Sequence, residues 1–187
     1  CGVVVWLCLG GRPRDAAGTA RPGWLVVGLL LFPSLAAGLA WLAQPSDAGR
    51  WLLLYAICLV WVADIGAYFA GRAFGRRKLA PRVSGGKTWE GLAGGLLAVG
   101  VYAAACGLGL GLSAAGLAGW ILLALAAGVF SVAGDLLESI VKREAGVKDS
   151  GSLLPGHGGL LDRIDSLIAA VPLLALGLGG LQLAGTG

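Results

Sequence analysis

The stretch from residue 139 to residue 166, SIVKREAGVKDSGSLLPGHGGLLDRIDS, carries most of the side chains in this chain that could take part in a reaction. It combines cations that suit phosphate, carboxylates that could bind a metal ion or act as a base, and the single histidine: Lys142, Arg143, Lys148, Asp149, Asp162, Asp165 and His157. The glycines of PGHGG would let backbone N–H groups approach a phosphate closely. The pattern indicates a site for a phosphorylated ligand.

His157 and Gly158 lie in the glycine loop that follows Pro155. Histidine can act as a general acid or base, but a lone histidine can equally be a structural hydrogen-bonding group. Both roles stay open for His157. The neighbouring glycines, Gly158 among them, predict a loop that binds phosphate through its backbone.

Carboxylates within apolar segments need a reason, because an ionisable residue in a membrane span costs roughly 2.5 to 3.5 kcal/mol on insertion scales. Residues three apart share a helical face, so Asp162 and Asp165 can converge on one site. Asp135 can converge with Glu138 in the same way, with Lys142 one turn further on. Grouped carboxylates suit Mg²⁺. The alternative is that Asp162 and Asp165 cap a helix N-terminus.

Asp64 and the segment SGGKT, residues 84–88, lie elsewhere in the chain but at the same predicted membrane face. Asp64 could belong to the site or form a structural ion pair. SGGKT resembles a small phosphate-binding nest with a lysine attached, so Lys87 is a candidate phosphate ligand. It is not a Walker A loop, because the first glycine at its four-residue spacing is absent.

The composition predicts that the bilayer is the solvent of this chain. Of its 187 residues 57% are hydrophobic and 13% are charged, and mean hydropathy is +0.84, whereas about a quarter of residues are charged in soluble domains. The net charge of +4 is interleaved with apolar segments, which favours anionic lipid or a phosphorylated ligand over nucleic acid. Because the chain has no methionine, even at position 1, we expect a single membrane-embedded domain, residues 1–187, that lacks its N-terminal part.

The expected fold is an all-α polytopic membrane protein. A bilayer core of about 30 Å needs about 20 apolar residues in a helix. Five complete spans meet this requirement, at residues 24–43, 51–70, 91–112, 116–141 and 160–184, and residues 1–10 form part of a sixth. Tryptophans fall near the span ends, as is typical of membrane interfaces: Trp24, Trp41, Trp51, Trp89 and Trp120.

The distribution of basic residues predicts the orientation of these spans. Residues 11–23, 71–90 and 142–163 contain all but one of the 14 lysines and arginines, and the exception is Arg50. Basic residues accumulate on the cytoplasmic side of membranes, so the two long loops, residues 71–90 and 142–163, are expected in the cytoplasm. Small-residue pairs such as Gly91 with Gly95 and Gly107 with Gly111 could allow close helix packing.

The run KREAGVKDSGSLLPGHGGLLDRIDS closely resembles the signature of phosphatidate cytidylyltransferases, also called CDP-diacylglycerol synthases. That signature reads K-R-x4-K-D-x-G-x2-L-P-x-H-G-G-x-x-D-R-x-D. Three further stretches are similar to the family: DIGAYFAGRAFGRRKL, SGGKTWEG and GDLLES. The resemblance covers about residues 51–175.

The resemblance implies an integral enzyme of a bacterial-type inner membrane, usually a homodimer, that joins CTP to phosphatidic acid and releases pyrophosphate. It implies Mg²⁺, with a second cation such as K⁺. Carried over by motif, Asp135, Asp162 and Asp165 would be metal ligands, and Lys148, Asp149 and Asp165 would be catalytic. The residues implied in substrate binding are Ser84, Lys87, Thr88, Lys142, Arg143, His157 and Gly158.

Two other functions remain alternatives at this point. A CTP-dependent lipid kinase, such as a polyprenol kinase, would transfer the γ-phosphoryl group and yield CDP. An ion or proton transporter would use the buried carboxylates as a relay, but it is expected to carry charges on both sides of the midplane. Many family members also have Pro-Lys-Lys where this chain has Gly85, Gly86 and Lys87, so the role of that loop is not carried over directly.

Overall fold

The computed structural model describes residues 22–44, 47–81, 83–144 and 161–185. The part described consists of five helices and one short hairpin: α2 (Pro22–Leu42), α3 (Asp47–Phe74), β1 (Lys78–Ala80), β2 (Ser84–Thr88), α4 (Trp89–Gly109), α5 (Ala114–Glu144) and α6 (Leu161–Gly185). The expected sixth segment, residues 1–10, lies outside the described residues.

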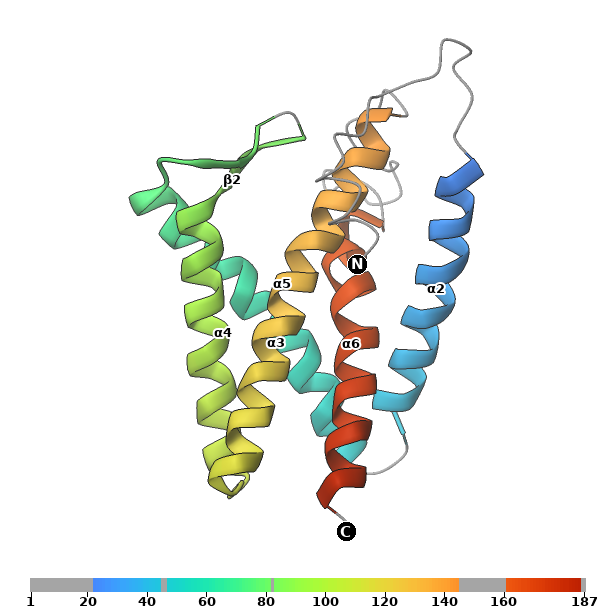
Figure 1. Cartoon of the computed structure of the whole chain (residues 1–187), viewed down its shortest axis with the longest axis vertical. Helices are drawn as coiled ribbons and strands as arrows, with labels where there is room; N and C mark the ends of the chain where they lie inside the picture. Colours follow the sequence, from blue (N-terminus) through green and yellow to red (C-terminus); the bar gives the residue numbers. More distant parts are fainter. Residues whose placement is uncertain (1–21, 45–46, 82, 145–160, 186–187) are drawn as a thin grey trace.

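The helices form one bundle whose members alternate in direction (Figure 1). α3 crosses obliquely behind α4 and α5, and α6 lies between α5 and α2. The most extensive contacts join α3 to α4 and α5 to α6. As a result, the hairpin and the end of α5 lie at one end of the bundle, and the α2–α3 and α4–α5 turns lie at the other.

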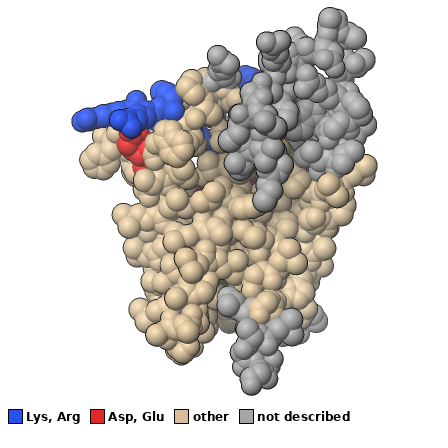
Figure 2. Space-filling view, viewed as in Figure 1, with Lys and Arg blue, Asp and Glu red and all other residues tan. Residues whose placement is uncertain are grey.

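Within the described residues, three helices are long and apolar enough to cross a membrane: Gly49–Phe74 in α3, Trp89–Gly109 in α4 and Ala114–Arg143 in α5. The described apolar parts of α2 and α6 are shorter, Gly28–Leu42 and Ile164–Gly180. The prediction of a helical membrane protein is therefore confirmed, while the prediction of five complete spans is supported for three. On the face shown in Figure 2, charged residues gather at the hairpin end, above a broad uncharged surface.

The core lies where the helices meet, and small residues allow the closest contact. Leu59 of α3, Val99 of α4 and Leu174 of α6 are fully buried. A Cβ atom at Gly95 would lie 2.8 Å from the carbonyl oxygen of Ala63, so α3 and α4 could not keep this distance with a larger residue. The predicted Gly91 and Gly95 pair thus acts at the α3–α4 interface.

Three details differ from the sequence-based expectations. The described fold is nearly all helical, as predicted, but it includes one short hairpin in which β1 and β2 pair antiparallel with Lys78 opposite Thr88 and Ala80 opposite Ser84. Gly111 does not pair with Gly107 for helix packing; it lies in the α4–α5 turn with a φ of 67°. Trp120 is buried rather than interfacial, because its ring packs against Tyr55 with centroids 4.6 Å apart.

Candidate functional site

The contact between Lys87 of β2 and Asp135 of α5 is the centre of the candidate site. Lys87 Nζ lies 2.5 Å from Asp135 Oδ2, and the two side chains are 24% and 29% exposed. The other carboxylate oxygen, Oδ1, accepts a hydrogen bond from Ser139 Oγ at 3.4 Å. The hairpin and α5, which are far apart in sequence, are therefore joined by an ion pair that is partly shielded from solvent.

Two further carboxylates lie within electrostatic range of this ion pair. Asp64 of α3 is acted on electrostatically by Asp135, Lys87 and Asp165. Asp165 of α6 is acted on by Asp135, Glu138 and Lys87. α3, α5, α6 and the hairpin thus each contribute a charged group to the same region. The sequence predicted that Asp135 and Asp165 belong to one site, and it left open whether Asp64 does.

Gly134 allows α5 and α6 to approach at the site itself. A Cβ atom at this position would lie 2.6 Å from the carbonyl oxygen of Asp165 and 3.1 Å from Ala169 Cβ. The first contact is with backbone, which cannot move aside as a flexible side chain can. Asp135 in GDLLES was predicted as a site residue but Gly134 was not, although a small residue directly before a carboxylate in an apolar segment was an available signal.

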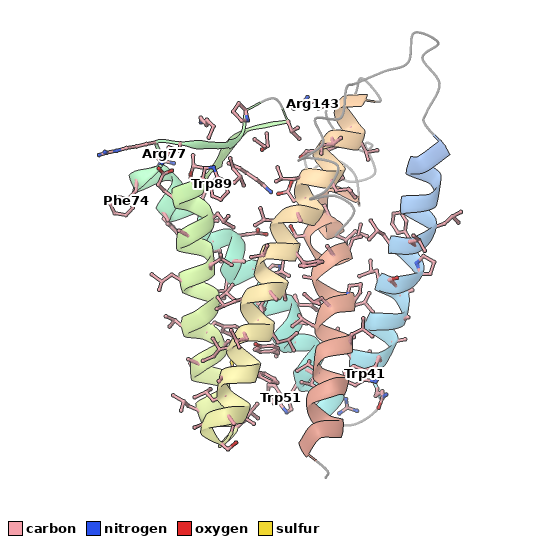
Figure 3. All side chains as sticks on the ribbon, in the orientation of Figure 1. Trp41, Trp51, Phe74, Arg77, Trp89 and Arg143 are labelled. Atoms are coloured by element: carbon pink, nitrogen blue, oxygen red, sulfur yellow. The ribbon has the colours of Figure 1, made fainter. Side chains whose placement is uncertain are left out.

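The end of α5 carries the next predicted residues. Lys142 Nζ lies 3.0 Å from Glu138 Oε2, and Glu138 is 5% exposed. The expected convergence of these two residues on one helical face is confirmed. Arg143 is exposed and lies at the same end of the bundle as the hairpin (Figure 3).

Glu90, another residue missed by sequence analysis, fixes the hairpin that carries Lys87. Its carboxylate accepts the backbone N–H groups of Arg76 at 3.1 Å and of Arg77 at 3.2 Å. The backbone N–H of Trp89 donates to the Arg77 carbonyl oxygen at 3.0 Å. These bonds hold the residues between α3 and β1 against the start of α4. They therefore fix the position of the hairpin, whose second strand, β2, contains Lys87.

The SGGKT segment is a strand rather than a phosphate-binding nest. Gly85 and Gly86 lie in β2, and neither has the left-handed φ that a nest requires. Thr88 is buried and caps α4, because its Oγ1 accepts the Gly91 N–H at 3.1 Å. Ser84 is half-buried at the start of the strand. Substrate binding stays a prediction for Ser84 and Thr88, while Lys87 faces the carboxylates.

Several predicted site residues lie outside the part of the chain that the structure describes. These are Lys148, Asp149, His157 and Gly158, together with the side chain of Asp162. Among the described residues, no group of three or more His, Cys, Asp and Glu side chains is placed to hold a metal ion. Asp165 is the fifth residue of α6, so it lies inside the helix rather than at its N-cap, and its Oδ1 accepts the neighbouring Ser166 N–H at 2.6 Å. It also interacts electrostatically with Asp135 and Lys87, which lie on other elements.

The arrangement suits chemistry on a phosphorylated molecule near one membrane face. Asp64, Asp135 and Asp165 supply oxygen donors of the kind that hard divalent cations prefer. Lys87 supplies a cation beside them, and the basic residues of the hairpin and of α5 add positive charge at the same end.

Comparison with known proteins agrees with this chemistry. Residues 3–179 match the model of the cytidylyltransferase family. The chain belongs to this family. The family resemblance seen in the sequence motifs is thereby confirmed.

Several similar proteins are named phosphatidate cytidylyltransferase. The chain is 58% identical over 127 residues to the phosphatidate cytidylyltransferase of Haemophilus influenzae, which covers 66% of this chain and 44% of the relative. It is 53% identical over 151 residues to that of Pseudomonas aeruginosa, covering 81% and 55%. It is 44% identical over 126 residues to that of Bacillus subtilis, covering 67% and 46%. The chain thus spans about half the length of the curated relatives that it matches.

Proposed function

We propose that the protein transfers CMP from CTP to phosphatidic acid, giving CDP-diacylglycerol and pyrophosphate. The observation that carries the proposal is the Lys87–Asp135 ion pair, because it unites the hairpin with the α5 and α6 carboxylates in a chain of the cytidylyltransferase family. The location of this site at one end of apolar helices supports a reaction between a lipid headgroup and a water-soluble nucleotide.

In the proposed reaction, a phosphate oxygen of phosphatidic acid attacks the α-phosphorus of CTP in line. The new P–O bond forms as the bond to the bridging oxygen breaks, and pyrophosphate leaves with that electron pair. The second pKa of a phosphate monoester is about 6, so the attacking phosphate is mostly ionised at neutral pH. No strong base is needed to deprotonate it. Lys87, with Lys142, Arg143 and Lys148, would bind phosphate oxygens, while the backbone near His157 and Gly158 would orient them.

Asp135, Asp162 and Asp165 would hold Mg²⁺. A second cation such as K⁺ would share the site. The carboxylates fit this role by the chemistry of their oxygen donors: Asp135 contacts Lys87, and Asp64 and Asp165 lie within electrostatic range of that pair, although the described side chains alone do not form a complete metal site. When bound, the ion would neutralise charge on the transferring and leaving phosphoryl groups.

The same proposal includes a membrane topology and an assembly. Five spans would cross an inner membrane, with the hairpin and the residues following α5 on the cytoplasmic side, where basic residues accumulate. This side is where CTP is available. The protein would work as a homodimer, as the family resemblance implies, and the mass of the detergent-solubilised protein tests that point.

The activity is tested by product analysis. Membranes containing the protein are incubated with CTP, phosphatidic acid and Mg²⁺, and we expect CDP-diacylglycerol and pyrophosphate in equal amounts. Formation of CDP with a phosphorylated lipid would instead identify a lipid kinase. Ion flux in liposomes without nucleotide would identify a transporter.

Asp165→Asn tests the assignment of the α6 carboxylate. The change keeps the shape of the side chain but removes its charge, so we expect turnover to fall by at least about 100-fold while the protein remains folded. The matched control is Arg50→Gln, at the opposite end of α3, which should keep normal turnover. Near-normal turnover of Asp165→Asn would remove this residue from the metal site.

A further inference from the structure

A second basic surface lies outside the candidate site, on the outer edge of the hairpin. We call it the hairpin-edge patch, and it consists of six exposed residues: Arg72, Phe74, Arg76, Arg77, Lys78 and Trp89. Figure 2 shows the basic side chains gathered at this corner of the molecule, with acidic atoms directly below them. None of these residues makes an ion pair with the carboxylates around Lys87 in the described part of the chain.

The local structure presents the arginine side chains outward. Glu90 binds the backbone N–H groups of Arg76 and Arg77, which fixes the chain without using their guanidinium groups. Neither guanidinium forms an ion pair with a carboxylate of the described residues, both side chains are exposed, and Arg77 lies at the hairpin in Figure 3. Five N–H donors on each arginine are therefore available to an external acceptor.

The position of the patch relative to the apolar surface suggests which acceptor that is. The patch lies where α3 ends and α4 begins, at the limit of two helices long enough to cross a bilayer. Phe74 and Trp89 are 70% and 56% exposed and lie below Arg77, toward the bundle (Figure 3). Aromatic rings of this kind settle at the level of lipid headgroups, so the arginines reach the depth of the lipid phosphates.

We propose that the hairpin-edge patch binds the phosphate groups of anionic membrane lipids, separately from the site around Lys87 and Asp135. Arginine binds phosphate in a bidentate manner, and basic residues next to a membrane span are attracted to anionic lipids. The four basic residues face only one nearby described carboxylate, Glu90, so the patch keeps net positive charge. This binding would hold the hairpin at the membrane surface. It does not depend on the proposed enzymatic activity.

The test uses the purified whole protein in detergent, titrated with short-chain phosphatidylglycerol, and native mass spectrometry to count bound lipid. Phosphatidylglycerol carries a phosphodiester, so it does not mimic the phosphate monoester of phosphatidic acid. Phosphatidylcholine and inorganic phosphate are titrated in parallel. We expect phosphatidylglycerol to bind more tightly than phosphatidylcholine, and more weakly as salt concentration rises.

Single substitutions then locate the binding. Arg76→Gln and Arg77→Gln should each weaken the affinity for phosphatidylglycerol about fivefold. Arg76→Lys and Arg77→Lys should recover part of it, because the charge is kept while the bidentate geometry is lost. Arg50→Gln, which removes one exposed arginine from the opposite end of α3, should have no effect.

Three results would overturn the proposal. Unchanged affinity in both glutamine variants would mean that the lipid binds elsewhere. Equal affinity for the two lipids would exclude a role for headgroup charge. Displacement of phosphatidylglycerol by an equal concentration of inorganic phosphate would identify the patch as a site for soluble phosphate.

Discussion

Lys87 is the residue on which the candidate site depends most directly. Its amine is in contact with Asp135, and it acts on both Asp64 and Asp165. Carboxylates in a partly buried position are costly unless a cation compensates them. In the described part of the chain Lys87 provides that compensation, so its loss should affect stability as well as phosphate binding.

Lys87→Gln should therefore lower both turnover and thermal stability. Removing one partner leaves Asp135 without its cation, at a cost of about 1 to 3 kcal/mol. If Mg²⁺ binds these carboxylates, adding it should reduce the loss of stability more than it changes the wild-type protein. Thermal unfolding of the purified protein with and without Mg²⁺ measures both effects, and Arg50→Gln serves as the control. A stability equal to wild type in the absence of Mg²⁺ would contradict the compensating role of Lys87.

At the scale of elements, the site exists because two helix pairs pack closely beside it. α3 and α4 meet through small residues such as Gly95, and α5 and α6 meet at Gly134. The second contact places Gly134, the residue before Asp135, directly beside the backbone of Asp165. Helix separation is therefore a property that the site requires, and a single methyl group is enough to change it.

Gly134→Ala tests this requirement. The added Cβ would lie 2.6 Å from the Asp165 carbonyl oxygen, so α5 and α6 must move apart. We expect a loss of about 1 to 3 kcal/mol in stability, together with lower turnover. The matched control is Gly180→Ala on α6, where nothing lies within 4 Å of the added atom. At Gly180, the better helix propensity of alanine should leave stability equal to wild type or slightly higher. Equal stability of the two variants would contradict the packing argument.

At the scale of the whole molecule, the two ends of the bundle differ in chemistry. The hairpin and Arg143 lie at one end, where Lys87 of the hairpin contacts Asp135, and the α4–α5 turn lies at the other (Figures 1 and 3). Charge asymmetry of this kind orients membrane proteins. The structure therefore places the candidate site at one end of the bundle, and the proposed topology assigns that end to the cytoplasmic side.

Cysteine labelling in intact cells tests that orientation. Gly85 in β2 and Gly109 at the end of α4 are exposed, and neither has atoms within 4 Å of an added Cβ. In a variant whose own cysteines are replaced, Gly109→Cys should react with a membrane-impermeant thiol reagent from outside. Gly85→Cys should react only after the membrane is permeabilised. Labelling of both positions from the same side would exclude the proposed topology.

The order of the helices and some contacts within them follow from local sequence. The reason is that a bilayer stabilises long apolar helices and destabilises isolated charges. The alternation of apolar runs with basic loops predicted the order of the helices. The spacing of Glu138 and Lys142 predicted their ion pair, since both lie on one helix. The motif PGHGGLLDRIDS predicted the family together with the stretches DIGAYFAGRAFGRRKL, SGGKTWEG and GDLLES. The match over residues 3–179 confirms that family.

Other features depend on contacts between distant segments, and only the tertiary structure decided them. The pairing of β1 with β2, the Glu90 contacts that fix the hairpin, and the burial of Trp120 against Tyr55 all arise this way. So does the meeting of Lys87 with Asp135, which a nest-like interpretation of SGGKT did not foresee. The sequence by itself determined which residues are charged, and it predicted that most of them gather at one end of the helices. Which of them touch was decided by helix packing, because the separation set by residues such as Gly134 depends on both helices at once.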